Sequence, residues 1–165
     1  MENLYRNQLK INADLNNKLE YIATILEGAK LEANTSPAGF TEPVDLPVKT
    51  LQDLQDLETK LADDKEYKNY LHFLKRIGGR NCVETTRRII SILIGHNLAL
   101  QCNWTGRNSK TAFNINKALI KLITEAVISN PACGSEATAS LIEGTMKAWL
   151  RGACDRDGGR VNRKK

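Results

Sequence analysis

The sequence predicts an all-α protein, with a long N-terminal coiled-coil helix followed by a compact bundle of about five helices. Three observations support this. Apolar residues recur at spacings of three and four along most of the chain. Thr, Asp and Ser residues stand just before several of these runs, where helix caps are expected. Prolines and glycines fall between the runs, and 41% apolar residues suffice for a core.

Residues 2–33 form one helical pattern that contains no proline. Apolar residues occupy most of the positions of a heptad seam, although Gln8 and Lys18 interrupt it. A lone helix would leave this stripe in water, so we expect residues 1–33 to assemble copies of the chain. The alternative is a helix that folds back onto its own domain. The seam residues expected at the interface are Leu4, Ile11, Leu15, Ile22 and Ile25.

Segments of different composition divide the rest of the chain. Residues 34–48 contain three prolines and a glycine, which predicts a linker. Residues 49–151 carry the helical patterns of a single domain. Residues 152–165 are polar, basic and glycine-rich, which predicts a flexible tail.

The first helices of the domain have clear start signals. Thr50, with Asp53 three residues later, predicts a capped helix whose leucines lie on one face through Leu61. Asp63 and Asp64 predict the cap of a second helix, over 65–76. We expect Gly78–Gly79 to end that helix, because glycine adopts the left-handed conformation of a C-cap.

A central helix is predicted over Val83–Leu93, with Arg87 and Arg88 on its polar side. Gly95 to Asn97 interrupt the pattern, and a short helix is expected to begin at Leu98. A turn around Trp104 follows, and the indole is large enough to hold this turn against the core.

Two further helices complete the predicted bundle. One is expected over 111–129, with Lys110, Lys117 and Lys121 sharing a face and Asn130–Pro131 ending it. The other begins near Ser135, buries a stripe that includes Trp149, and carries Lys147 and Arg151 on its outer side.

The charge is divided unevenly. Residues 1–74 hold 8 basic and 13 acidic residues, a net charge of −5, whereas residues 75–165 hold 16 and 6, a net charge of +10. A basic half of this kind attracts polyanions. We therefore predict a DNA-binding, chromatin-associated module in the nucleus. The phosphate contacts are expected from Arg87, Arg88, Arg107, Lys110, Lys117, Lys121, Lys147 and Arg151.

The same charges also suit a scaffolding protein that self-associates and binds an acidic protein segment. Catalysis is not expected, because His72 and His96 lack a nucleophile or carboxylate pair nearby in the sequence. The four cysteines form no CxxC pair, so they are expected to be free thiols, with neither a metal nor a cofactor.

No apolar run approaches the ~18 residues of a membrane span, and the N-terminus lacks the apolar core of a signal peptide. Membrane association is therefore not expected. The predicted location is the nucleus, and the alternative is the cytoplasm.

About two-thirds of the chain, from Leu46 to Arg151, resembles the metazoan family of unknown function numbered 4806. The resemblance is carried by LPVKT (46–50), IGG (77–79), TRRI (86–89), LALQ (98–101), NWTGR (103–107), KTAF (110–113) and KAWLR (147–151). The family implies a fold and boundaries but no activity. The order of helices is also similar to the BEN domain, an all-helical module associated with DNA binding and transcriptional regulation.

Overall fold

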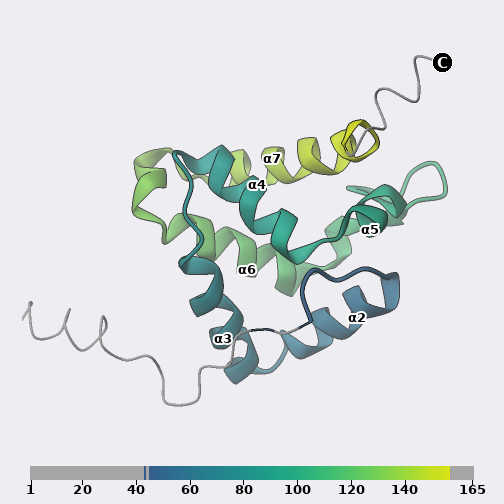
Figure 1. The fold of residues 1–165 in the computed structure, drawn as a ribbon, viewed down its shortest axis with the longest axis horizontal. Coiled ribbons are helices and arrows are strands. Elements are labelled where there is room, and N and C mark those ends of the chain that lie inside the picture. Colours follow the sequence, from purple (N-terminus) through teal and green to yellow (C-terminus); the bar gives the residue numbers. More distant parts are fainter. Residues whose placement is uncertain (1–42, 44, 157–165) are drawn as a thin grey trace, which may run out of the picture. The chain divides into compact units, whose positions relative to one another are not determined.

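The computed structural model describes residue 43 and residues 45–156. The predicted coiled coil over 1–33, most of the predicted linker and the end of the tail lie outside these residues. The described part is mostly helical, which confirms the all-α class (Figure 1). Its α-helices are α2 (Leu51–Lys60), α3 (Asp64–Lys75), α4 (Cys82–Leu93), α5 (His96–Gln101), α6 (Lys117–Ile128) and α7 (Ala139–Arg151).

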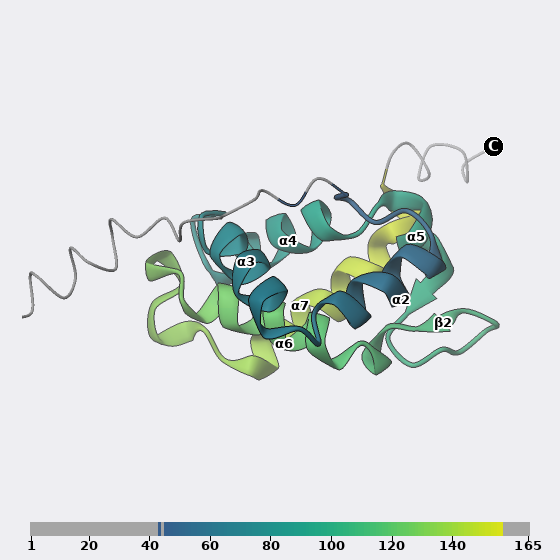
Figure 2. The same cartoon turned by 90° about the horizontal axis from the view of Figure 1, so that it is seen from below.

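Helix α4 lies at the centre of the core. Its residues Ile89, Ile90 and Leu93 are fully buried, and the helix packs against both α6 and α7 (Figure 2). Helices α3 and α2 pack on α6 in turn. The spacing of apolar residues that predicted these helices therefore also defines their buried faces.

The start of α2 follows the predicted capping chemistry, and α4 also has a side-chain cap. Thr50 and Asp53 form a reciprocal capping box at α2, with the Thr50 hydroxyl accepting from the Asp53 amide at 3.1 Å. These hydrogen bonds hold the pKa of Asp53 below its usual value. Asn81 caps α4 by accepting a hydrogen bond from the Glu84 amide at 2.9 Å.

Helix α6 receives its cap from a distant part of the chain. The Glu58 carboxylate of α2 accepts hydrogen bonds from the amides of Ala118 and Leu119, at 2.7 and 3.0 Å. The local N-cap residue, Asn116, makes no side-chain hydrogen bond to this helix. Glu58 therefore satisfies the free amides of α6 and places a negative charge at the positive end of its dipole.

The end of the predicted linker is part of the domain. Val48 is only 5% exposed, and its amide donates to the Leu93 carbonyl while its own carbonyl accepts from the Gly95 amide, both at 2.9 Å. At the other end, Gly152–Asp155 form a 3-10 turn that buries Ala153. The folded unit thus extends beyond 49–151 on both sides.

The role expected for Gly78–Gly79 is wrong. Helix α3 ends at Lys75 with Arg76 in a right-handed conformation, and neither glycine has a positive φ. Gly79 instead lies against the start of α4, where an added Cβ would be 2.6 Å from the Thr85 amide nitrogen. Close approach of two backbone segments, not left-handed geometry, explains this glycine.

The predicted helix over 111–129 begins later than expected. Thr111–Ala112 form strand β2, which pairs in parallel with β1 (Cys102–Asn103), and Phe113–Ile115 form a 3-10 turn before α6. Lys110 precedes the strand, so it does not share a helical face with Lys117 and Lys121. The strand pairing takes up the backbone hydrogen bonds that an earlier helix start would have used.

Replacing Glu58 with alanine should lower the free energy of unfolding by about 1–2 kcal/mol, because two helix amides lose a charged acceptor. Urea denaturation would measure this. The control is Asp56→Ala in the same helix, whose carboxylate accepts a hydrogen bond from the exposed Gln52 side chain at 3.0 Å. We expect the control to change stability by less than about 0.5 kcal/mol. Equal losses in the two variants would contradict a capping role for Glu58.

Candidate functional site: a basic groove beside Trp104

The loop between β1 and β2 projects beyond the helices in both views (Figure 1, Figure 2). The Asn103 side chain fixes its shape from inside. Its amide oxygen accepts from the Gly106 amide at 2.5 Å, and its amide nitrogen donates to the Arg107 carbonyl at 2.7 Å. One side chain therefore holds the two arms of the turn together.

Three loop residues have a positive φ: Gly106 at 79°, Asn108 at 56° and Ser109 at 57°. Glycine and asparagine tolerate this conformation, whereas serine adopts it less often. At Gly106 an added Cβ would also lie 3.1 Å from the Cβ of Ala112 in β2. The loop is thus a defined turn held against the strand that follows it.

Between this loop and α7 lies a groove of about 540 Å³. Four cationic side chains line it, two from the loop and two from the helix, and we call it the basic groove. Its other lining residues are neutral, and none is Asp or Glu. The four cations are Arg107, Lys110, Lys147 and Arg151.

Trp104 forms an aromatic part of the basic groove. Its indole is half-buried and packs against Phe113, with 6.3 Å between ring centroids and 37° between ring planes. The Lys147 ammonium lies 5.1 Å from the centroid of the indole and 2.5 Å from a Glu143 carboxylate oxygen. Lys147 is therefore held between an aromatic face and an acid at the rim.

Two other hollows of the described domain have mixed charge. One lies beside α2, where Asp45, Asp53 and Asp56 accompany Lys49 and Lys60. The other lies between α3 and α6, with two acidic and two basic residues among its lining. The basic groove differs from both because its charges have one sign, so their fields add within it.

The structure brings together four of the eight predicted phosphate-contacting residues. Lys121 lies in the hollow between α3 and α6, with its ammonium 3.8 Å from Glu125 and 5.3 Å from the Tyr67 ring centroid. The Tyr67 hydroxyl donates to Glu125 at 2.8 Å, and burial together with this contact raises the pKa of Tyr67. Lys117 is exposed at the start of α6 and does not line the groove.

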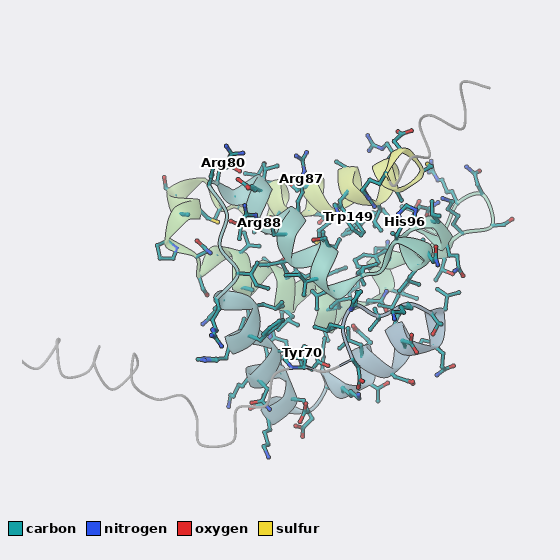
Figure 3. All side chains as sticks on the ribbon, viewed as in Figure 1. Tyr70, Arg80, Arg87, Arg88, His96 and Trp149 are labelled. Carbon is teal, nitrogen blue, oxygen red and sulfur yellow. The ribbon has the colours of Figure 1, made fainter. Side chains whose placement is uncertain are left out.

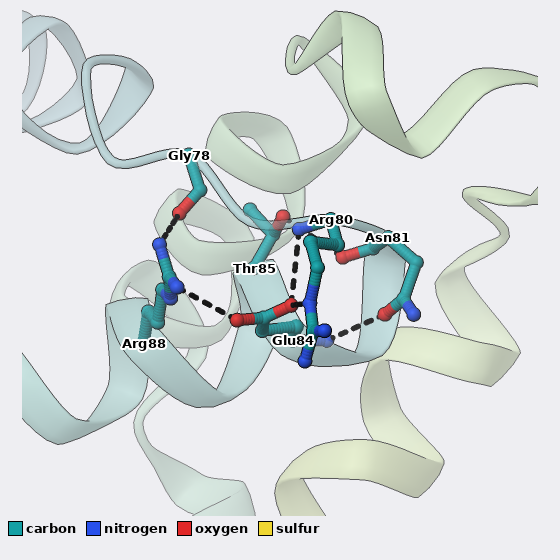
Figure 4. A network of polar contacts seen from close by, with 6 residues as sticks. All are labelled: Gly78, Arg80, Asn81, Glu84, Thr85 and Arg88. Carbon is teal, nitrogen blue, oxygen red and sulfur yellow. Dashed lines mark hydrogen bonds and ion pairs between the residues drawn. The ribbon is translucent and has the colours of Figure 1, made fainter.

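Arg87 and Arg88 extend from α4, and Arg80 lies just before that helix (Figure 3). Figure 4 shows that Arg88 is largely committed to local contacts, donating to Glu84 at 2.7 Å and to the Gly78 carbonyl at 2.8 Å. Arg80 donates to the same carboxylate at 2.9 Å. Arg87 is exposed. These arginines form a region separate from the residues that line the groove.

From the sequence, Asn103 and Trp104 were predicted to form a turn and were not predicted to belong to a binding site. The signal was present, because Asn103–Trp104 is followed within six residues by Arg107 and Lys110. An aromatic residue among cations is typical of nucleic-acid-binding surfaces. The spacing did not indicate that α7 would line the same groove, because α7 lies next to this loop only in the folded structure.

Other features of the described residues bear on metal binding and on membranes. Cys82, Cys102 and Cys133 are buried, whereas Cys154 is exposed. No cluster of three or more His, Cys, Asp or Glu side chains there is arranged to hold a metal ion. Among these residues, none of the helices has the length and apolar character needed to cross a membrane.

The fold and groove define a small, mostly helical domain that carries a concave basic surface between the β1–β2 loop and α7. The model of the family "Domain of unknown function (DUF4806)" matches residues 41–126, more than half of the chain, and the chain belongs to this family. No curated protein and no solved structure matches the chain. The matched residues include the loop with Trp104, whereas α7 lies beyond them.

Glu84 makes stability depend on pH. The Arg80 side chain and the Arg80 backbone amide both donate hydrogen bonds to the Glu84 carboxylate, and the positive charges of Arg80 and Arg88 lie nearby. Together they lower the pKa of Glu84 to about 2, against 4.5 for an ordinary glutamate. A carboxylate whose pKa is lower in the folded state stabilises the fold above the unfolded-state pKa. We expect this contribution to fade as pH falls from about 4.5 towards 2. Urea denaturation over this range should show a smaller pH dependence for Glu84→Gln, and parallel curves would contradict the assignment.

Gly106 and Gly144 provide a matched pair of glycine substitutions. Gly106→Ala should lower the free energy of unfolding by about 1–2 kcal/mol, because alanine there must keep a positive φ and press on Ala112. Gly144 lies inside α7, where an added Cβ meets nothing within 4 Å. Gly144→Ala should therefore stabilise the protein by about 0.5–1 kcal/mol. Thermal denaturation followed by circular dichroism would test both signs.

Proposed function

We propose that this protein is a nucleic-acid-binding module, in which the basic groove contacts phosphates. The observation that supports it is the groove itself, where four cations from two elements line one hollow without an acidic residue. Phosphate is the anion that such a surface favours, because guanidinium and ammonium groups donate charge-assisted hydrogen bonds to its oxygens. DNA is the proposed ligand, and the module is proposed to act by binding rather than by catalysis.

The groove cations differ in how freely they can bind a ligand. Arg107 and Arg151 are exposed, and Lys110 is half-buried near the thiol of Cys102. Lys147 already contacts Glu143 and Trp104. Arg107, Lys110 and Arg151 are therefore the proposed primary phosphate contacts. Arg87 and the partly committed Arg88 would add long-range attraction.

A single groove with about four phosphate contacts binds weakly at physiological salt. Pairing of chains through residues 1–33, if the predicted coiled coil forms, would place two such grooves on one nucleic-acid polymer and raise the avidity. A nuclear, chromatin-associated location would follow from this ligand. The N-terminal pairing is part of the proposal and is independent of the groove.

The triple variant Arg107→Gln, Lys110→Gln, Arg151→Gln should weaken DNA binding and flatten its salt dependence. With four phosphate contacts, the logarithm of the association constant should fall with log salt at a slope of about −3.6 on duplex DNA and about −2.8 on a single strand. Removing three contacts should reduce the slope to about −1. Fluorescence anisotropy with labelled DNA over a salt series would measure both quantities.

The matched control is Lys68→Gln, Lys117→Gln, Lys121→Gln, which removes the same charge from exposed positions on α3 and α6. We expect it to reduce affinity less and to leave the slope nearly unchanged. Equal losses in the two triple variants would show that net charge, not the groove, governs binding. Polyglutamate in the same assay tests the scaffolding alternative, because an acidic protein ligand would compete as well as DNA does.

A further inference from the structure

The basic groove holds more than phosphate-binding groups. Trp104 lines it, half-buried and packed against the buried Phe113 ring. Its backbone carbonyl accepts from the Asn114 amide at 3.1 Å, so the main chain is also fixed. Phosphate binding needs no aromatic ring, whereas an indole beside cations suits a flat ring attached to a phosphate.

We propose that the groove takes an unpaired nucleotide, with its base stacked on Trp104 and its neighbouring phosphates held by the groove cations. This inference rests on the proposed function and specifies the state of the nucleic acid. In a duplex, neighbouring bases cover both faces of each base, so the indole can reach a base face only where the strand is unpaired or the base is turned out. The volume of about 540 Å³ is within the range of pockets for small ligands.

Lys147 is the group that a base would displace. Its ammonium now lies over the indole at 5.1 Å, and its side chain is 38% exposed on a flexible stem. A cation over an aromatic ring is held more weakly than a stacked base, so the exchange is favourable. Once displaced, Lys147 remains within the groove and binds the phosphate that the base brings with it.

The rim offers hydrogen-bonding groups but no fixed pattern that would select one base. Thr105 and Asn108 are exposed and line the groove, whereas the Asn103 amide is already occupied by the turn. A threonine hydroxyl and an asparagine amide can each donate or accept. The site is therefore expected to accept different bases, with stacking rather than edge recognition providing most of the preference.

The test compares two strands of equal length and charge, an oligothymidylate and an abasic oligonucleotide, using the full chain. Trp149 is the second of two tryptophans, so the Trp149→Phe background isolates the emission of Trp104. We expect the thymidylate to quench this emission to saturation and to bind at least about five-fold more tightly than the abasic strand. A hairpin duplex should bind without comparable quenching.

Trp104→Leu should abolish the difference between the two strands while leaving salt-dependent binding of the abasic strand. Retained abasic binding shows that the groove is still folded. If this variant fails to fold, Trp104→Phe serves instead, with a smaller preference for thymidylate expected. Lys147→Met should keep the preference, because the base replaces Lys147 at the ring.

Equal affinity for the two strands, or thymidylate binding without quenching, would overturn the stacking inference and leave the groove as a phosphate site. Failure of all three nucleic acids to bind at low salt would overturn the proposed function itself, and the inference with it. The two failures are thus distinguishable in one set of titrations.

Discussion

The packing of α4 against α6 and α7 is the contact on which the rest of the domain depends. Ile89, Ile90 and Leu93 are fully buried in it, and Val48 attaches the entering chain to the end of the same helix by two backbone hydrogen bonds. With one side of α7 fixed by α4, the helix also packs beside β1. The groove therefore exists because the core fixes α7, and its shape is set by burial far from the cations.

The position of each cationic side chain in the fold also determines whether it can contact a negatively charged ligand. Arg88 donates hydrogen bonds to Glu84 and to a backbone carbonyl, and Lys121 lies beside Glu125 and Tyr67. Such contacts between exposed side chains stabilise little, but they reduce the charge presented to a ligand. The lining residues of the groove include no acid, so the four cations that line it form a local positive surface.

Local signals predicted the helices well. Periodicity located α2, α3, α4 and α7, and Thr50 and Asp63 cap as predicted, because caps and amphipathic faces depend on residues a few positions apart. The predicted start of the last helix near Ser135 is wrong, since α7 begins at Ala139 with Thr138 as its cap. Other errors involve distant partners. Pairing of β1 with β2 delays the start of α6, Thr85 requires a glycine at position 79, and Glu58 caps a helix 60 residues away. Four groove cations were predicted individually, but their meeting depends on tertiary structure.

The long-range contact between Glu58 and α6 limits the order in which the helices can fold while the chain is being synthesised. During synthesis, α2 leaves the ribosome about 60 residues before the amides that its carboxylate will bind. The apolar face of α4 likewise waits for α7, nearly the last described element to emerge. A nascent chain that stalls before α7 would therefore expose the apolar face of α4, a state that chaperones bind and proteases remove.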